Sequence, residues 1–443
     1  MKILLAFSIA FFAFGISMFV FTLQQSALMG CIAFLVTLWT NEALPLGVVS
    51  LLPIVLFPAF GIIDTKMTAV NYANPIIYLF FGGFLLSIAV EKTNLHLHVA
   101  NKLLNIFPAT PRGMIFSLAF TSGLLSSILS NTTTTLLLIP MAIFLTDNVK
   151  LKMRFALAIA YGASIGGILT PIGTPPNLIL LGIMQEHNMQ LVSFFQWMLM
   201  VAPLSAAMLI SVAFLLSYGV NNIQIQTEIK NNILNKSQKK VMYLMLGLIL
   251  VLFVNAPIRP YWNGLGMSES GILLGFGLAL FMPPLNILDW NEDSKKIPYA
   301  IMFLFGAGFS IAKAFAQTGL ADEVALYLLS MMHLSPLLLL LSVAVLITFT
   351  TEITSNTALI SIMLPVIYSV AQQSGINTTL FMMVATLCAS YAFMLPIATP
   401  PNAIAMSSGV VSVKSMMKYG IVLNLLGIFF IVLTAEYFWK NIL

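Results

Sequence analysis

Two polar triplets interrupt a chain that is otherwise strongly apolar. The sequence Ser-Asn-Thr occurs at 130–132, where it opens the run SNTTTT, and again at 355–357. Polar groups at membrane depth need hydrogen-bond partners or a ligand, because hydrocarbon satisfies neither donors nor acceptors. Hydroxyl and amide oxygens suit a hard cation such as Na+, while free backbone N–H groups at a helix start suit an anion. The triplets are therefore candidates for a site that binds cations and an anion together.

A second motif, Thr-Pro-Pro-Asn, occurs at 174–177 and at 399–402. Proline donates no backbone hydrogen bond and restricts the residue before it, so two adjacent prolines disfavour a continuous helix. We predict unwound breaks at 173–176 and 398–401, each within a membrane-crossing helix. If two such breaks and two triplet-bearing turns meet near the bilayer midplane, they expose helix N-termini and free carbonyls to one shared pocket.

The two halves of the sequence repeat each other at a spacing of 225 residues. No gap is needed to align 79–177 with 304–402, and both motifs coincide in that alignment. Internal repeats of this kind are typical of secondary transporters. The further matches are Gly83 with Gly308, Phe84 with Phe309, Thr93 with Thr318, Leu95 with Leu320, Pro140 with Pro365, and Pro171 with Pro396.

The composition places the chain in a membrane. Hydrophobic residues make up 60% of it and charged residues 7%, whereas about a quarter of the residues of an average protein are charged. Apolar runs of transmembrane length recur along nearly all 443 residues, which predicts an all-α polytopic protein of the cell membrane, surrounded by lipid. The formal charge of +5 requires no nucleic-acid partner, since Lys and Arg collect in cytoplasmic loops. The two cysteines and four histidines form no pattern for a disulfide framework or a metal site.

The apolar runs and the repeat together predict the domain organisation. Residues 1–25 form a first transmembrane helix and 26–220 the first repeat, while the polar segment 221–240 is a cytoplasmic linker and 241–443 form the second repeat. Each repeat is expected to contain a re-entrant hairpin and a broken transmembrane helix. These lie at about 113–147 and 153–189 in the first repeat, and at about 336–371 and 377–410 in the second.

The positions of the basic residues predict how the chain crosses the membrane. With a cytoplasmic N-terminus and two hairpins that enter and return, about eleven full crossings remain. Fifteen of the 19 Lys and Arg residues then lie in inside loops and three in outside loops, as the positive-inside rule requires. The two repeats then have opposite orientations and form an inverted repeat.

These motifs carry a family resemblance. The paired triplets, the stretch NEALPL at 41–46 and the paired Thr-Pro-Pro-Asn segments resemble the divalent anion:sodium symporter (DASS, INDY-type) family, over essentially the whole chain. The resemblance implies a homodimeric, elevator-type transporter that carries dicarboxylates or citrate, with Na+ as the coupling ion. We accordingly expect sodium-coupled symport of divalent anions, above all C4-dicarboxylates such as succinate or malate, and no enzymatic activity.

The same resemblance implies which residues bind sodium and substrate. The first sodium site would comprise Ser126, Ser130, Asn131 and Gly173, and the second Thr351, Thr354, Asn356 and Ala398. The substrate carboxylates would meet Asn131, Thr132, Asn356 and Thr357, helped at the breaks by Thr174, Pro175, Thr399 and Pro400. The asparagines that follow the prolines, Asn177 and Asn402, are expected to stabilise the breaks rather than to touch substrate.

Three charged residues lie in or near the apolar runs. Glu42 is expected to anchor a helix end. Glu352, on the second hairpin, either tunes cation binding or holds the hairpin arm by hydrogen bonds, and Lys313 either snorkels or pairs with an acid. Because neither motif contains Lys or Arg, a bound dianion depends on Na+ and helix N-termini for compensation, so sodium is expected to bind first.

Several alternatives stay open. A sodium-independent dicarboxylate exchanger and a sulfate or citrate carrier share the same fold. An anion channel would conduct without saturation, and the matched hairpins argue against it. An intramembrane enzyme would need a His, Cys or paired-acid constellation at depth, and the sequence shows none.

Overall fold

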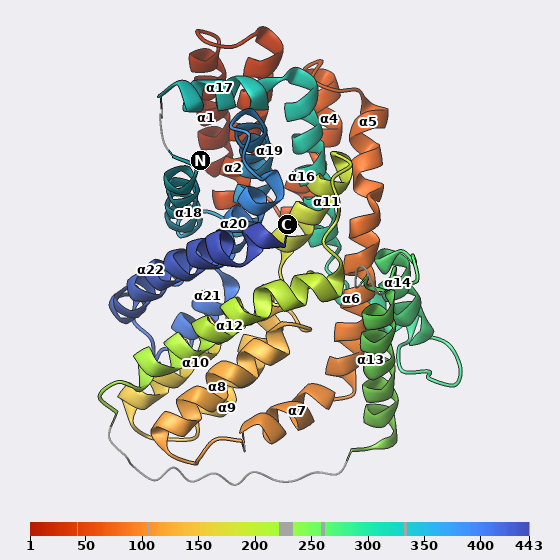
Figure 1. The fold of residues 1–443 in the computed structure, drawn as a ribbon, viewed down its shortest axis with the longest axis vertical. Helices are drawn as coiled ribbons and strands as arrows, with labels where there is room; N and C mark the ends of the chain where they lie inside the picture. Colours follow the sequence, from red (N-terminus) through yellow and green to blue (C-terminus); the bar gives the residue numbers. More distant parts are fainter. Residues whose placement is uncertain (42, 105, 221–233, 258–261, 332–334, 443) are drawn as a thin grey trace.

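The computed structural model describes residues 1–41, 43–104, 106–220, 234–257, 262–331 and 335–442. Over these residues the regular structure consists of α-helices and short 3-10 helices, with no strand (Figure 1). The predicted all-α class is confirmed. Helices are expected here, because a single segment that crosses lipid can satisfy its backbone N–H and C=O groups only by hydrogen bonds within itself.

Several apolar runs of the first half contain two helices each. The apolar run 45–63 divides at Leu52, and the next helix begins at Pro53. The run at 76–104 divides near Asn94, whose φ of 57° lies in the left-handed region. The helices of this half are α1 (Lys2–Ser17), α2 (Leu23–Asn41), α3 (Leu46–Leu51), α4 (Pro53–Ala59), α5 (Thr65–Val70), the 3-10 helix η1 (Asn71–Ala73), α6 (Pro75–Lys92), α7 (Leu95–Leu104), α8 (Pro111–Ser126), α9 (Asn131–Ile143), α10 (Val149–Gly167), α11 (Pro175–Glu186) and α12 (Phe194–Ser217).

The second half begins at α13, and residues 221–233 of the predicted linker lie outside the described residues. Its helices are α13 (Lys236–Asn255), α14 (Glu269–Ala279), α15 (Trp290–Asp293), η2 (Ser294–Lys296), α16 (Tyr299–Thr318), α17 (Leu320–Met331), α18 (Pro336–Thr351), α19 (Asn356–Gln373), α20 (Thr378–Ser390), α21 (Pro400–Ser407), α22 (Val413–Tyr437) and η3 (Trp439–Asn441).

Among the described residues, six helical segments are long and apolar enough to cross a membrane. Shorter apolar helices accompany them, α9 and α18 among them. The chain is therefore a multi-pass membrane protein, while about eleven crossings and an inverted orientation of the repeats stay predictions. The six segments are Leu23–Asn41, Thr65–Lys92, Phe194–Ser217, Lys236–Asn255, Tyr299–Thr318 and Val413–Tyr437.

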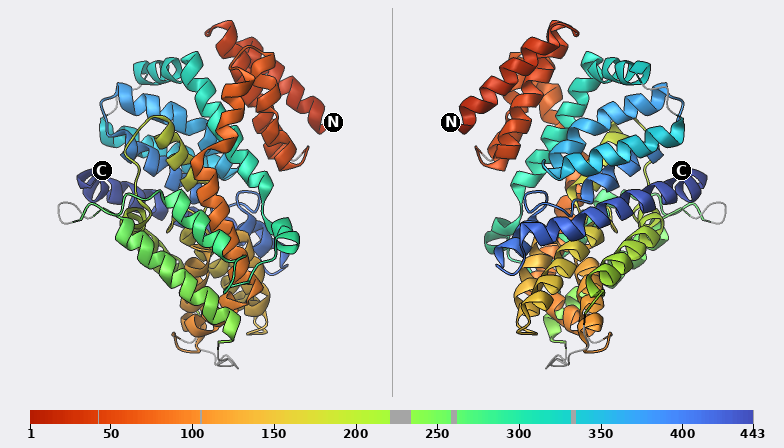
Figure 2. Two further views of the ribbon diagram at one scale, coloured as in Figure 1. Left: turned by 90° about the vertical axis from the view of Figure 1, so that its right-hand side faces the viewer. Right: turned by 90° about the vertical axis from the view of Figure 1, so that its left-hand side faces the viewer.

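The helices pack as two groups. The motif group consists of α8–α12 and α18–α22 and contains both triplets and both Thr-Pro-Pro-Asn segments; within it α10 packs against α8, α9 and α12, and α20 against α18, α19 and α22. The frame group consists of α1–α6 and α13–α16, where α6 packs against α14 and α16 against α3. Helices α7 and α17 connect the groups. Figure 2 shows α1 and α2, in red, at one edge of the molecule.

The frame group contains a buried acid that joins α6 to the connection between α14 and α16. Asp293 lies in this connection and is 1% exposed. Its carboxylate contacts Lys92 of α6 at 2.6 Å and Lys296 at 3.0 Å. Two cations around one buried carboxylate fix the start of α16 against α6.

Candidate functional site

Each triplet lies at the start of the second helix of a helix pair. Helix α8 ends at Ser126 and α9 begins at Asn131, while α18 ends at Thr351 and α19 begins at Asn356. The serine of each triplet is the N-cap: the hydroxyl of Ser130 accepts from the backbone N–H three residues on at 3.0 Å, and that of Ser355 does so at 3.5 Å. Both triplets thus place further N–H groups of a helix start at the end of a turn.

Each Thr-Pro-Pro-Asn segment marks the point where a helix resumes. Helix α10 ends at Gly167 and α11 begins at Pro175, while α20 ends at Ser390 and α21 begins at Pro400. The non-helical stretches are thus 168–174 and 391–399, which are longer than the four-residue breaks that the sequence predicted. The prolines themselves are the first residues of α11 and α21, where a missing N–H costs nothing. The unwound backbone lies before them.

Asparagine side chains bridge both non-helical stretches. The amide nitrogen of Asn177 donates to the carbonyl of Thr170 at 2.9 Å and to that of Gly167 at 3.5 Å. The amide nitrogen of Asn402 donates to the carbonyls of Leu395 and Ala392, both at 3.0 Å. These carbonyls occupy matching positions in the 225-residue repeat. Both asparagine side chains are fully buried, so they hold the breaks, as expected.

Glu352 holds the second break. Its carboxylate is 3% exposed and accepts from three consecutive backbone N–H groups, those of Phe393, Met394 and Leu395, at 2.8 to 3.1 Å. The amide of Asn424 donates to it at 2.6 Å. Of the two roles considered for this acid, the hydrogen bonds show the structural one, and its partner is the break rather than its own hairpin arm.

The first break is held without a charge. Ser127 occupies the position that matches Glu352 in the repeat, and its backbone carbonyl accepts from the hydroxyl of Thr170 at 2.6 Å. The indole N–H of Trp197 donates to the carbonyl of Ile168 at 2.9 Å. Each break therefore has its own asparagine bridge, but among the described residues only the second is also held by a carboxylate.

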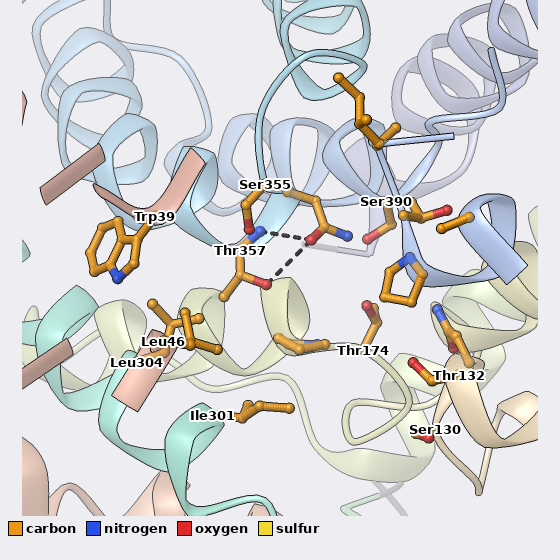
Figure 3. Close-up of a pocket in the computed structure, with 18 of the residues that line it drawn as sticks. Trp39, Leu46, Ser130, Thr132, Thr174, Ile301, Leu304, Ser355, Thr357 and Ser390 are labelled. Carbon is orange, nitrogen blue, oxygen red and sulfur yellow. Dashed lines mark hydrogen bonds between the residues drawn. The ribbon is translucent and has the colours of Figure 1, made fainter. Parts of the chain in front are cut away.

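A cavity of about 1300 Å³ brings both motifs of both halves together. Figure 3 shows Thr132 and Thr174 on one side of it and Ser355 and Thr357 on another. The residues of the motifs and of the predicted sites that line it are Ser130, Asn131, Thr132, Gly173, Thr174, Pro175, Thr354, Ser355, Asn356, Thr357, Ala398, Thr399 and Pro400.

Two of the predicted sodium ligands lie behind the cavity wall. Ser126 and Thr351 are fully buried and are not part of the lining. The hydroxyl of Ser126 donates to Oδ1 of Asn131 at 2.6 Å, and that of Thr351 donates to the carbonyl of Ala389 at 2.9 Å. A Cβ at Gly167 would lie 2.6 Å from Oδ1 of Asn131, so the backbone approaches this amide closely.

The frame group supplies an opposite, largely apolar wall that the motifs did not predict. Its residues include Trp39, Phe80, Phe84, Ile301 and Leu304; Figure 3 shows Trp39, Ile301 and Leu304 facing the motif residues. Such side chains resemble lipid-facing ones in sequence, and the single nearby signal is the NEALPL stretch, whose Glu42 lies outside the described residues.

The motif residues of the site are uncharged and rich in oxygen. Among the described lining residues, Lys2 is the charged one, and its Nζ donates to the carbonyl of Asn41 at 2.7 Å. The described residues contain no cluster of three or more His, Cys, Asp or Glu that could hold a metal ion. Buried oxygens without a partner remain at both breaks, namely Oδ1 of Asn177 and Asn402 and the hydroxyl of Thr399. Hydroxyl, amide and carbonyl oxygens fit Na+ rather than a transition metal.

An all-helical membrane protein in which broken helices and uncharged polar turns surround one cavity is, by class, a transporter. A model of the citrate transporter family (CitMHS) matches residues 32–386, and the chain belongs to this family.

Curated relatives agree. The chain is 31% identical over 434 residues to the sodium-dependent dicarboxylate transporter SdcS of Staphylococcus saprophyticus, a match that covers 90% of this chain and 83% of that one. It is 32% identical over 441 residues to SdcS of Staphylococcus aureus (strain MRSA252), covering 92% and 84%. The resemblance to the divalent anion:sodium symporter family is confirmed, and so is the expectation of a transporter rather than an enzyme.

Solved structures of transporters share the fold. The YdaH transporter of Alcanivorax borkumensis matches with a TM-score of 0.59 at 15% identity, covering 83% of this chain and 86% of that one. MtrF of Neisseria gonorrhoeae matches with a TM-score of 0.62 at 11% identity, covering 95% and 96%. At such identities the likeness concerns the fold alone.

Proposed function

We propose that this chain is a sodium-coupled symporter of divalent anions and that its substrates are C4-dicarboxylates such as succinate or malate. The observation that carries the proposal is the meeting of both triplets and both breaks in one cavity. The staphylococcal relatives are named sodium-dependent dicarboxylate transporters, which supports Na+ as the coupling ion and a dicarboxylate as the substrate.

Sodium binds at two sets of oxygens, one from each half of the chain. The first set comprises Ser126, Ser130, Asn131 and Gly173, and the short contact from Ser126 to Asn131 already brings two of its oxygens together. The second set comprises Thr351, Thr354, Asn356 and Ala398. Oδ1 of Asn356 accepts from the backbone N–H of Thr357 at 2.8 Å, which fixes this amide at the start of α19.

The dicarboxylate binds between the two triplets. One carboxylate meets Asn131 and Thr132 and the other Asn356 and Thr357, while Thr174, Pro175, Thr399 and Pro400 complete the wall at the breaks. Helix N-termini supply partial positive charge there. They do not neutralise a dianion alone, so bound Na+ completes the anion site and substrate affinity rises with sodium concentration. This order of binding couples uptake to the inward sodium gradient.

The motif group is the part that moves, and the frame group is the part that stays in place in a homodimer. Helices α11 and α19 of the motif group meet the frame group along α16, and movement along that contact is the elevator step that we propose. The N-terminus is on the cytoplasmic side, and 26–220 and 241–443 are inverted repeats, each with a re-entrant hairpin and a broken helix. The charge bias of the loops supports this orientation.

Uptake of radiolabelled succinate into proteoliposomes tests the function. An inward sodium gradient should drive uptake above equilibrium, and replacement of Na+ by choline should abolish it. Asn356→Ala should raise the half-saturating sodium concentration by about tenfold, the effect of losing roughly 1.4 kcal/mol of binding. Ser342→Ala on α18, whose hydroxyl bonds its own helix and lies outside the lining, is the matched control and should behave as the unmodified chain does.

The same vesicles separate the alternatives. If succinate counterflow in sodium-free vesicles is as fast as in vesicles with Na+, the chain is an exchanger and the symport proposal is wrong. Competition by malate, citrate and sulfate ranks the substrates, and stronger competition by citrate or sulfate than by malate would overturn the C4 assignment. The cavity volume of about 1300 Å³ accommodates each of these anions, so chemistry at the triplets rather than size sets the preference.

A further inference from the structure

Within the part of the chain that the structure describes, two polar side-chain contacts join the motif group to the frame group. One is an ion pair between Glu186 of α11 and Lys313 of α16. The other is a hydrogen bond from the backbone N–H of Phe194, the first residue of α12, to the carboxylate of Glu269, the first residue of α14. We name these two contacts the outer clasp.

The ion pair of the clasp lies partly buried. Nζ of Lys313 is 3.4 Å from Oε1 of Glu186, and the two side chains are 35% and 15% exposed. Lys313 precedes the end of α16 at Thr318 by five residues, which is about 7.5 Å along a helix. An ionisable residue inside a membrane helix marks a functional contact by default. Of the roles considered for Lys313, the structure shows pairing with an acid.

The second contact of the clasp places a carboxylate at a helix start. Both oxygens of Glu269 lie within reach of the N–H of Phe194, at 2.8 and 2.9 Å. Negative charge at an N-terminus is favourable because the helix dipole is positive there. The contact therefore ties the start of α12, in the motif group, to α14, in the frame group.

Both contacts lie on the side that the charge bias predicts to be extracellular. Glu186 and Phe194 flank the connection 187–193, which lies outside in that topology. The cavity reaches the opposite side, where its lining includes Lys2, Ile301 and Ser407.

Close packing lets the groups meet along α16. A Cβ at Gly308 of α16 would lie 2.6 Å from the hydroxyl of Ser361 in α19, and a Cβ at Gly182 of α11 would collide with the ring of Phe309. Small residues bring helix backbones close together. The outer clasp thus lies beside the contact of α16 with α11 and α19, and this close contact fits one relative position of the two groups.

We propose that the outer clasp holds the state in which the cavity opens to the cytoplasm and separates when the cavity opens outward. The inference rests on the proposed function, because a symporter exposes its site to each side in turn. Displacement of α11 against α16 by one helical turn, about 5.4 Å, takes a 3.4 Å ion pair out of contact. Glu186, Lys313 and Glu269 touch no predicted ligand, so they are positioning residues.

Labelling of a cavity residue from each side of the membrane measures the state directly. Ala403 is exposed and lines the cavity, and Ala403→Cys is the reporter. The native cysteines Cys31 and Cys388 are buried, so they add little background. The rate of reaction with a membrane-impermeant maleimide is measured in inside-out and right-side-out vesicles, and the ratio of the two rates reports the balance between the states.

Neutralising either charge should shift that ratio away from the cytoplasmic side. Glu186→Gln and Lys313→Gln should each change it by about twofold to fivefold, the upper part of the range for a part-exposed ion pair. The exchange of both charges, Glu186→Lys with Lys313→Glu, should restore it. Lys440→Gln breaks an exposed ion pair with Glu436 at the end of α22, away from the frame group, and should leave the ratio unchanged.

Glu269 gives a second and independent comparison. Glu269→Ala removes the acceptor and should shift the ratio in the same direction, whereas Glu269→Gln keeps an acceptor oxygen and should shift it less.

The outcomes decide the clasp separately from transport. An unchanged ratio in both single neutralisations, or a charge exchange that fails to restore it, overturns the ion pair as a state-dependent contact. Labelling from one side alone in every variant overturns the clasp, because no second state exists. If the unmodified chain shows no sodium-driven uptake of succinate, the proposed function is wrong. The labelling experiment does not depend on transport, so it tests the outer clasp separately.

Discussion

Removal of the Glu352 carboxylate is the most direct test of how the second break is built. Three backbone N–H groups of the unwound stretch and the amide of Asn424 donate to this one buried group. The stretch also contains Ala398, a predicted sodium ligand. A loss at Glu352 should therefore affect both the stability of the protein and its response to sodium.

The magnitude follows from the donors. In Glu352→Gln, one oxygen still accepts but the charge is lost, and charge-assisted hydrogen bonds worth about 1.5–3 kcal/mol become neutral ones worth about 0.5–1.5 kcal/mol. Summed over the four donors, and with some relaxation of the surrounding backbone, Glu352→Gln should lower the free energy of unfolding by about 2–4 kcal/mol. In Glu352→Ala the buried donors lose their partner at about 1–3 kcal/mol each. The alanine variant should therefore be the less stable of the two.

Thermal unfolding of purified protein in detergent measures both effects. The unfolding temperature should be lower for Glu352→Gln than for the unmodified chain, and lowest for Glu352→Ala. In both variants NaCl should raise the unfolding temperature, relative to choline chloride, by less than it does in the unmodified chain, because a ligand that binds the folded state more weakly stabilises it less. Thr170→Val is the matched variant in the first half. It removes one neutral hydrogen bond and should cost about 0.5–1.5 kcal/mol.

A Glu352→Ala protein that unfolds at the unmodified temperature with an unmodified sodium response would refute the reasoning. It would mean that water or relaxed backbone satisfies these donors, and that the carboxylate does not shape the break. A variant that loses stability but keeps its full sodium response would restrict the role of Glu352 to folding.

Three further predictions follow from single groups. Asn402→Ala should lower succinate uptake more than Pro400→Ala, since the amide bridges two carbonyls of the break while the proline is the first residue of a helix; equal losses would contradict this. Gly166→Ala should abolish folded protein on size-exclusion chromatography, because its Cβ would collide with a facing backbone carbonyl, whereas Gly275→Ala has open space and should be tolerated. Burial alone would raise the pKa of Asp293, but hydrogen bonds from its two lysines and a backbone N–H hold that pKa below its usual 3.8. Its stabilisation is thus present above pH 3.8 and is lost as pH falls through the lower folded value, so the unfolding temperatures of the unmodified chain and Asp293→Asn should differ at pH 7 and converge in acid.

The sequence predicted the class of fold and the assembly of the motifs because both depend on local or repeated signals. Apolar runs require helices in lipid, and the adjacent prolines of each Thr-Pro-Pro-Asn segment disfavour a continuous helix, which predicts an interruption near them. Two motifs that recur together at one spacing imply equivalent places in the two halves. Ten residues of the two motifs, from both halves, line the cavity, in line with that reasoning.

The rest depended on contacts between distant parts of the chain. The breaks begin earlier than predicted, because Asn177 and Asn402 satisfy carbonyls up to ten residues before them. Glu352 acts on N–H groups 41 to 43 residues away, and no spacing rule in one sequence indicates that. The apolar frame wall was missed since a lining leucine and a lipid-facing leucine have the same sequence signature.

The asparagine bridges described above also bear on how such a molecule diverges over time. Each amide bonds to carbonyls of its own half, so the asparagine bridge of one break does not depend on the other half. The two copies of a duplicated segment can then come to differ at matching positions, as Ser127 and Glu352 do, while each copy keeps its own bridge. One break can in this way change while the other keeps its shape.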